Sequence, residues 1–236
     1  MTTQENENKE QFKRNQLKIK QKWEKSGIKI SKELRDIIHG YIMSDGYIRN
    51  GILTIDQSQE QKRFVEWLHQ KLTSIRTSKT ITEVVRTHPK TLKKTHSLRF
   101  YTKAVLHGFH HMWYIPYVDK NNVIKYKKGL PKSIACFFNE SVITLWYAGD
   151  GTKVLGSLGA KFEVTAFTAE ERLKLKNLFL KKLGISTEIL SSGTSASGHS
   201  QWALKIPADQ YPQFRNLITK LDLIPTVFPN KLHKKQ

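Results

Sequence analysis

IHGYIMSDG at residues 38–46 and ITLWYAGDG at residues 143–151 are two apolar runs that stop at the same Asp-Gly pair. Each run is typical of a helix, and a glycine just past a helix end is common because φ is often positive there. The aspartates, Asp45 and Asp150, are unexpected, since a carboxylate in the last turn lies at the negative end of the helix dipole. The same exception at two matching places indicates that a cation belongs beside each aspartate.

The composition points to a polyanionic partner. The 236 residues include 40 Lys and Arg against 20 Asp and Glu, a net charge of +20, which favours nucleic acid over an anionic membrane surface. No apolar run approaches the roughly 18 residues of a membrane span, and no segment resembles a signal peptide. The single cysteine, Cys136, excludes a disulfide framework. We interpret it as a reduced core residue of an intracellular protein that is not secreted.

The pattern before residue 114 predicts a basic extension over 1–33 and a first repeat over 34–113. A helix over about 7–25 in the extension is either a solvated charged helix or an arm lying on nucleic acid. The elements expected in the repeat are a helix over 34–45, a hairpin of 47–49 and 52–57 around Asn50-Gly51, a helix over 61–74, strands over 80–87 and 95–101, and a helix over 104–113.

The same order recurs after a linker over 114–132. The expected second repeat, 133–222, is followed by a basic tail over 223–236. Its elements are a helix ending at Asp150, a strand over 161–167, a helix from a capping box at Thr168–Glu171 to Gly184, strands over 186–190 and 201–206 around a Ser/Gly-rich loop at 191–198, and a helix over 208–221. Two such copies predict an α+β fold with αββαββ-type repeats related by a pseudo-twofold.

The predicted strands alternate between apolar and polar side chains, as half-buried antiparallel sheets do. The polar faces are either solvated outer surfaces or surfaces that read base edges and phosphates, and the net charge favours the second reading. The candidate DNA-binding residues are Arg49, Thr82, Arg86, Arg99, Tyr101, Lys161, Glu163, Thr165, Gln201 and Lys205. The histidines at 107, 110 and 111 lack an acidic or cysteine partner nearby, so we do not expect a metal site there.

Taken together, these motifs resemble the LAGLIDADG homing endonucleases in their single-chain, two-repeat form. Beyond the two motif runs, Ile55–Ser58 and Val164–Thr168 resemble the text that precedes the second helix of each repeat. Lys127-Lys-Gly-Leu-Pro131 resembles the family's K-x-[IL]-P segment, and Leu223-Ile-Pro225 with Lys231 resembles its counterpart. The resemblance covers about residues 34–231. The chain departs from the family pattern at His39, Met43, Leu145 and Gly149, and at Thr165, where the family often has Gln.

The resemblance implies two antiparallel sheets that form a DNA-binding saddle, with the motif helices packed side by side. Small residues would permit the close approach of these helices: Gly40, Ser44, Thr144 and Ala148. The implied catalytic residues are Asp45, Asp150, Lys128, Lys231 and Gln57, with metal held by the two aspartates and by the backbone carbonyls of Ser44 and Gly149. Two close carboxylates repel one another, and a divalent cation removes that repulsion.

The resemblance therefore implies a monomeric endonuclease that cuts both strands of a long asymmetric DNA site with Mg²⁺ or Mn²⁺ and leaves 3′ overhangs, while Ca²⁺ supports binding without cleavage. The alternative is an intron RNA maturase on the same fold, and a transcriptional regulator is a third reading. We expect an organellar (mitochondrial or chloroplast) or bacterial protein encoded by a mobile intron.

Overall fold

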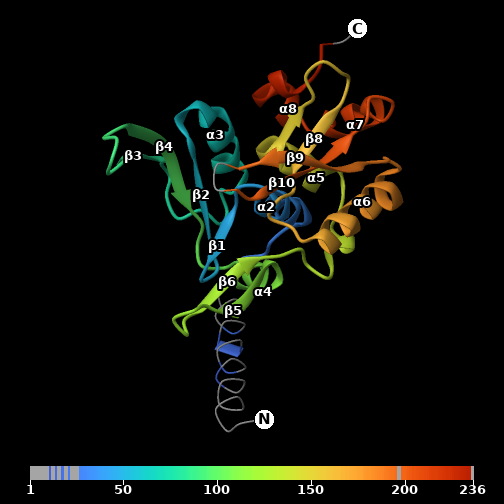
Figure 1. Cartoon of the computed structure of the whole chain (residues 1–236). Coiled ribbons are helices and arrows are strands. Elements are labelled where there is room, and N and C mark those ends of the chain that lie inside the picture. Colours follow the sequence, from blue (N-terminus) through green and yellow to red (C-terminus); the bar gives the residue numbers. More distant parts are fainter. Residues whose placement is uncertain are drawn as a thin grey trace, which may run out of the picture. The chain divides into compact units, whose positions relative to one another are not determined.

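A computed structural model describes residues 11, 14, 17, 18, 21, 27–195 and 198–234. The five residues described between 11 and 21 are helical, and the rest of the helix expected over 7–25 lies outside the described residues. The chain divides into two compact units, one formed by Met1–Ser31 with Ile48–His110 and the other by Lys32–Tyr47 with His111–Gln236. Figure 1 labels most of the helices and strands of both units.

The first unit is a four-stranded antiparallel sheet with one covering helix. The strand order is β1-β2-β4-β3, from β1 (Tyr47–Arg49), β2 (Ile52–Ser58), β3 (Thr82–Thr87) and β4 (Lys94–Tyr101). The predicted hairpin between β1 and β2 is confirmed: Asn50 and Gly51 have φ of 51° and 74°, the pair of positive values that a tight hairpin turn requires. After the short 3-10 turn η1 (Gln59–Gln61), α3 (Lys62–Lys71) buries the helically spaced side chains of Phe64, Val65 and Leu68.

The second unit contains a sheet of the same form and both motif helices. Its strand order is β7-β8-β10-β9, from β7 (Gly151–Lys153), β8 (Ala160–Glu163), β9 (Glu188–Thr194) and β10 (Ser200–Ile206). Its helices are α2 (Lys32–Met43), α5 (Glu140–Asp150), α6 (Ala169–Leu183), α7 (Tyr211–Ile218) and α8 (Leu223–Val227), with 3-10 turns η2 (Ile134–Cys136) and η3 (Pro229–Lys231). The helix α4 (His107–Trp113) begins in the first unit and ends in the second.

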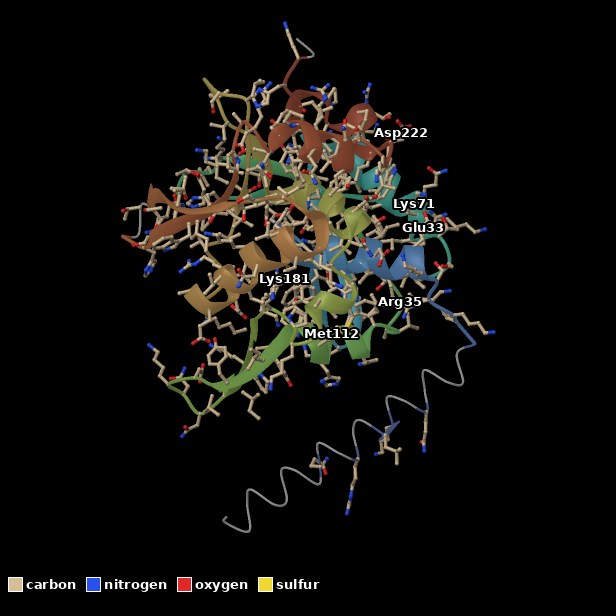
Figure 2. All side chains as sticks on the ribbon, turned by 90° about the vertical axis from the view of Figure 1, so that its right-hand side faces the viewer. Glu33, Arg35, Lys71, Met112, Lys181 and Asp222 are labelled. Atoms are coloured by element: carbon tan, nitrogen blue, oxygen red, sulfur yellow. The ribbon has the colours of Figure 1, made fainter. Side chains whose placement is uncertain are left out.

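The predicted ends of α6 are confirmed in detail. The Thr168 side chain accepts a hydrogen bond from the Glu171 backbone N–H at 3.2 Å, and Glu171 in turn accepts one from the Thr168 N–H at 2.8 Å. Gly184 ends the helix with φ of 67°, in the left-handed conformation that favours glycine. Lys181, in the exposed last turn, projects away from the helix (Figure 2).

The segment predicted as a linker contains a regular hairpin. Strands β5 (Tyr114–Val118) and β6 (Ile124–Lys128) pair antiparallel, with Tyr114 opposite Lys128 and Val118 opposite Ile124. Pro116 is compatible with this ribbon because a two-stranded sheet has free edges, where a missing N–H costs no ladder hydrogen bond. The short strand β7 and the short helix α8 were also not predicted, and β8 ends at Glu163 instead of residue 167.

Two further expectations were wrong. Cys136 is exposed and not in the core, because the single turn of η2 directs Ile134 inward instead. The motif glycines do not have positive φ: Gly151 has φ of −82°, and Gly46 is not among the described positive-φ glycines. Close packing explains why both positions require glycine: a Cβ would lie 2.6 Å from Tyr41 O at Gly46 and 1.9 Å from Tyr147 Cδ2 at Gly151.

The compact units do not follow the order of the sequence repeats. Although α2 precedes the first sheet in the chain, it belongs to the unit of the second sheet because it packs along α5. Both aspartates and both lysines singled out from the sequence therefore lie in one unit. The predicted repeat boundaries, 34–113 and 133–222, stay a prediction. Among the described residues, no helix is both long enough and apolar enough to cross a bilayer.

Candidate active site

The two motif helices approach each other at glycine. A Cβ at Gly40 of α2 would lie 2.4 Å from Leu145 Cβ and 2.7 Å from Val142 O of α5. At the other end of the contact, a Cβ at Gly149 would lie 2.4 Å from Ser44 Cβ. All three distances are far below van der Waals contact, so any larger residue at either glycine would push the helices apart.

The other predicted small residues of α5, Thr144 and Ala148, are buried, but the α5 residues that meet Gly40 and Ser44 are Val142, Leu145 and Gly149. The start of α5 is fixed to α2 as well: Asn139 caps α5 by accepting a hydrogen bond from Val142 N at 3.1 Å, and its amide nitrogen donates to Asp36 Oδ2 at 3.0 Å. The packing at Gly40 and the capping at Asn139 together set the position of the two helix ends.

Asp45 and Asp150 meet where these helices end. Asp150 is the last residue of α5, and Asp45 follows the last turn of α2. A Cβ at Gly149 would be 3.1 Å from Asp45 Oδ2, so the Asp45 carboxylate lies against the residue next to Asp150. Burial and, after it, the negative charge of Asp45 raise the pKa of Asp150 to about 7, against the lowering effect of Lys128 and Lys231.

Lys128 closes the end of α2. Its ammonium donates to the carbonyl oxygens of Ile42 and Ser44, both at 2.7 Å. Burial lowers the pKa of Lys128, and the charges of Asp150 and Asp45 oppose that shift. The lysine is thus a cation at the negative end of the helix dipole, where such a charge is favourable.

Lys231 likewise donates hydrogen bonds to the carbonyl oxygens at the end of α5. Its Nζ lies 3.1 Å from Tyr147 O, 2.7 Å from Ala148 O, 3.0 Å from Gly149 O and 2.7 Å from Gly151 O. The Tyr147 hydroxyl returns a hydrogen bond to Lys231 O at 3.0 Å. Burial lowers the pKa of Lys231 to about 8, against the raising effect of Asp150 and Asp45. A lysine therefore lies at the end of each motif helix, and both lysine charges lower the pKa of Asp150.

The donor set around the aspartates suits a hard divalent cation. Its atoms are carboxylate and carbonyl oxygens, and the carbonyls of Ser44 and Gly149 retain a lone pair beside the one that accepts from lysine. Within the described part of the chain, no cluster of three or more His, Cys, Asp or Glu side chains forms a metal site. A metal here would take most of its ligands from water and substrate phosphate, which is how Mg²⁺ is commonly held.

Gln57 lies in β2, in the first unit, where it is 9% exposed. The predicted DNA-binding residues of that unit all belong to the sheet. Arg49, Thr82, Arg86 and Tyr101 are exposed, and Arg99 is half-buried. Those of the second unit also lie on or beside its sheet: Lys161, Glu163 and Thr165 are exposed, and Gln201 and Lys205 are half-buried.

Several of these sheet residues already contact one another. The register places Lys161 opposite Lys205, and Lys205 Nζ lies 3.3 Å from Glu188 Oε2. The Thr165 hydroxyl donates to Glu163 Oε1 and accepts from Trp202 N at 2.7 Å. Thr165 therefore fixes the end of β8, a task that the sequence pattern did not indicate.

A family model described as the LAGLIDADG DNA endonuclease family matches residues 35–214. The chain belongs to this family. Its members are DNA endonucleases, so at the level of the family this chain is a DNA endonuclease. A comparison with curated protein sequences finds no significant match.

A solved structure shares the fold over nearly the whole chain. The homing endonuclease I-WcaI bound to its DNA recognition sequence is 18% identical, with 91% of this chain and 92% of that chain covered and a TM-score of 0.72. Mesophilic variants of the homing endonuclease I-DmoI are 14% identical over 80% of this chain and 97% of theirs, with a TM-score of 0.47. The first likeness supports the fold of a LAGLIDADG protein for nearly the whole chain.

Sequence reasoning missed two residues that organise the polar groups. Tyr147 packs on Gly151 and bonds the backbone of Lys231, and nothing in the motif distinguished it from a core aromatic residue. Asp56 accepts hydrogen bonds from both Arg86 and Arg99. A signal for Asp56 was present, because it occupies a polar position of an alternating strand in a strongly basic chain.

Proposed function

We propose that this protein is a site-specific, metal-dependent endonuclease that cuts both strands of duplex DNA as a monomer. The observation that carries the proposal is the meeting of Asp45 and Asp150 at neighbouring helix ends, with the pKa of Asp150 raised to about 7 by burial and by Asp45. Two crowded carboxylates that hold a proton in the metal-free protein are ready to exchange it for a cation.

We assign the cation to Mg²⁺ or Mn²⁺, held by the two aspartates with the carbonyls of Ser44 and Gly149. When bound, such an ion supplies Lewis-acid stabilisation of the scissile phosphate and lowers the pKa of its bound water. The protein's own part is to hold two carboxylates at one place and to keep Lys128 and Lys231 beside them as charges that stabilise the transition state. We propose that Gln57, which belongs to the first unit, orients water near the scissile phosphate.

The substrate assignment rests on charge and on the family. The net charge of +20 favours a polyanion, and the I-WcaI structure, which shares the fold, is bound to its DNA recognition sequence. Two acids at one place require two scissile phosphates that are close in space. In B-form DNA, phosphates of opposite strands approach across the minor groove, which is about 6 Å wide and offsets the partners in the 3′ direction. The products should therefore carry short 3′ overhangs.

The decisive experiment selects cleaved molecules from a random duplex library with Mg²⁺ and sequences both ends. We expect one long asymmetric site, short 3′ overhangs, activity with Mn²⁺, and binding without cutting in Ca²⁺. Asp45→Asn and Asp150→Asn should bind the selected site and leave it intact. Blunt ends or 5′ overhangs would contradict a single minor-groove centre. Tight binding to intron RNA without cutting of any duplex would favour a maturase instead.

A further inference from the structure

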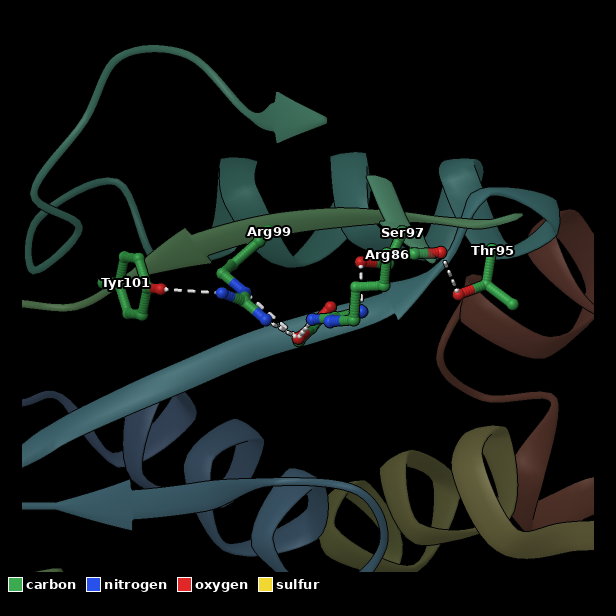
Figure 3. Close-up of polar contacts among 6 residues, drawn as sticks. Arg86, Thr95, Ser97, Arg99 and Tyr101 are labelled. Carbon is green, nitrogen blue, oxygen red and sulfur yellow. Dashed lines mark hydrogen bonds and ion pairs between the residues drawn. The ribbon is translucent and has the colours of Figure 1, made fainter. Parts of the chain in front are cut away.

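Asp56 lies on the polar face of the first unit's sheet, where it accepts hydrogen bonds from Arg86 and Arg99, the two arginines labelled in Figure 3. The register places Asp56 of β2 directly opposite Arg99 of β4. Arg99 Nε donates to Asp56 Oδ2 at 3.0 Å, and Arg99 Nη2 donates to the same oxygen. The guanidinium is therefore held side-on by one carboxylate oxygen, a geometry that fixes its plane.

Arg86 contacts the same oxygen from β3, the edge strand next to β4. It belongs to β3, and β4 lies between β3 and β2, so its side chain must span about two strand spacings, roughly 10 Å. Its Nη2 lies 2.5 Å from Asp56 Oδ2, and on the way its Nη1 donates to Ser97 Oγ at 2.9 Å. One carboxylate thus joins three strands through two cations.

The carboxylate remains charged in this setting. Burial disfavours its ionised form, but hydrogen bonds from Arg99, Ser97 and Arg86 outweigh burial, so the pKa of Asp56 lies below its ordinary value. The side chains of Asp56 and Arg99 are 25% and 26% exposed, whereas that of Arg86 is 45% exposed. Arg86 is therefore the side chain of the three that a ligand on this face would meet first, and Arg99 is as exposed as the carboxylate.

Arg99 keeps N–H donors that are not used within the sheet and that could bind a base edge. A guanidinium has five N–H groups, and three of them are engaged, since Nη1 also donates to Tyr101 Oη at 3.3 Å. One N–H is left on each terminal nitrogen. Two such donors match the O6 and N7 acceptors of a guanine in the major groove.

We propose that Asp56 is a specificity-determining residue that positions Arg99, with Arg86 beside it, as a fixed guanine reader on the first unit's sheet. The inference rests on the proposed function, since it requires this sheet to face duplex DNA. Free arginines on a basic surface bind phosphates of any sequence. Asp56 weakens such nonspecific phosphate binding, because it neutralises one of the two positive charges. It also fixes the remaining donors toward one base edge.

The test compares Asp56→Asn with a matched control, Glu83→Gln. Glu83 lies on β3 of the same sheet but on the opposite face, where it bonds His96 Nδ1 at 3.1 Å. Both variants raise the net charge by one. Affinities of wild type and both variants are measured in Ca²⁺ for the selected site, for its single-base variants and for random duplex.

We expect Asp56→Asn to lose discrimination at one or two guanine-containing base pairs, by about 5- to 150-fold, while it binds random duplex more tightly than Glu83→Gln does. Arg99→Lys, which keeps the charge but loses the fork, should lose discrimination at the same base pairs. The Arg99 Nε–H resonance should be visible by NMR in the free wild type and lost in Asp56→Asn.

Equal effects of Asp56→Asn and Glu83→Gln would overturn the inference, because net charge alone would then explain them. It is also overturned if Arg99→Lys leaves those base pairs discriminated, since Asp56 would then read a base itself. A melting curve for each variant shows whether the sheet is folded, and the NMR signal decides the positioning even where binding is weak. Failure of the wild type to select any duplex would count against the proposed function and not against the Asp56–Arg99 geometry.

Discussion

The carboxylate of Asp45 lies against Gly149, the residue that precedes Asp150: a Cβ at Gly149 would be 3.1 Å from Asp45 Oδ2 and 2.4 Å from Ser44 Cβ. Gly149→Ala should therefore force α2 and α5 apart. We expect a loss of about 1–3 kcal/mol in the free energy of unfolding, the usual cost of overpacking, and a much larger loss of cutting rate. Urea denaturation and single-turnover cleavage measure the two effects.

The matched control is Gly108→Ala. A Cβ at Gly108, in α4, has nothing within 4 Å, and alanine is favoured over glycine in a helix by about 0.5–1 kcal/mol. This variant should be at least as stable as wild type and equally active. Unchanged cutting by Gly149→Ala would show that the close approach of the two helix ends is not needed for the reaction.

Asp45→Asn should lower the pKa of Asp150 in the metal-free protein. Burial is the largest cause of the raised value and stays, but the repulsion from the Asp45 charge is removed. Carboxyl ¹³C chemical shifts of Asp150 followed through a pH titration measure the change. Asp222→Asn, which alters an exposed carboxylate of the same unit (Figure 2), should leave the titration where it was.

Metal binding should release a proton below about pH 7. The pKa of Asp150 is raised from 3.8 to about 7, so the metal-free protein holds a proton there that a cation must displace. Mg²⁺ affinity should therefore weaken as pH falls through about 7. Calorimetry in buffers of different ionisation enthalpy reports the number of protons released. Proton release that is the same at about pH 6 and about pH 8 would contradict the assignment.

The same group should make the metal-free protein less stable as pH rises. Between 3.8 and about 7, Asp150 is protonated in the folded state but ionised in the unfolded chain, so the folded state binds more protons. Stability from this group is then present at low pH and lost as pH rises through that window. Asp150→Asn should remove this slope, which chemical denaturation at several pH values measures.

His39 should give a slope of the opposite sign. Burial, with a smaller contribution from Arg35, lowers its pKa from 6.5 to about 4, and its Nδ1 accepts a hydrogen bond from Trp113 Nε1 at 2.9 Å. As pH falls from 6.5 toward 4, the unfolded chain takes up a proton that the folded state refuses, so stability is lost. His39→Gln should lack this contribution, and a difference in denaturation between the two proteins that is constant over this range would refute it.

Lys231→Ala should reduce both stability and cutting, because the carbonyls of Tyr147, Ala148, Gly149 and Gly151 lose their common donor. Unsatisfied buried carbonyls cost about 1–3 kcal/mol each at most, and entering water will satisfy some of them. Site preference should not change. Lys220→Ala, which removes an exposed pair with Glu140, should change stability by no more than about 1 kcal/mol. Loss of binding with an intact rate in the bound complex would refute the role of Lys231.

Local signals predicted the parts of this fold that local chemistry determines. The Asn50-Gly51 turn, the Thr168–Glu171 capping box and the Gly184 helix end all depend on residues within a few positions of each other. The hairpin of β5 and β6 was not predicted, because it depends on the pairing of two strands and not on a local signal. Pro116 and the Asn121-Asn122 pair indicate breaks in a chain, and only the pairing of two strands makes them compatible with a ribbon.

The site was predictable where a motif recurred and unpredictable where contacts join distant segments. Asp45 and Asp150 stood out because both break the same helix rule. The role of Gly149, which departs from the family pattern, depends on Ser44, a residue of another helix. The Asp56 cluster depends on β4 lying between β2 and β3, a strand order that no single strand's alternation reveals.

The membership of α2 in the second unit has a practical consequence for recombination. Both aspartates and both lysines belong to residues 32–47 and 111–236, so residues 48–110 form an inserted cassette whose seams fall after Tyr47 and before His111. A chimera joined at the segment between the two sheets would exchange α2 and leave α5 with a foreign partner. Grafts made at the cassette seams would instead transplant the first unit's sheet while leaving the helix pair intact.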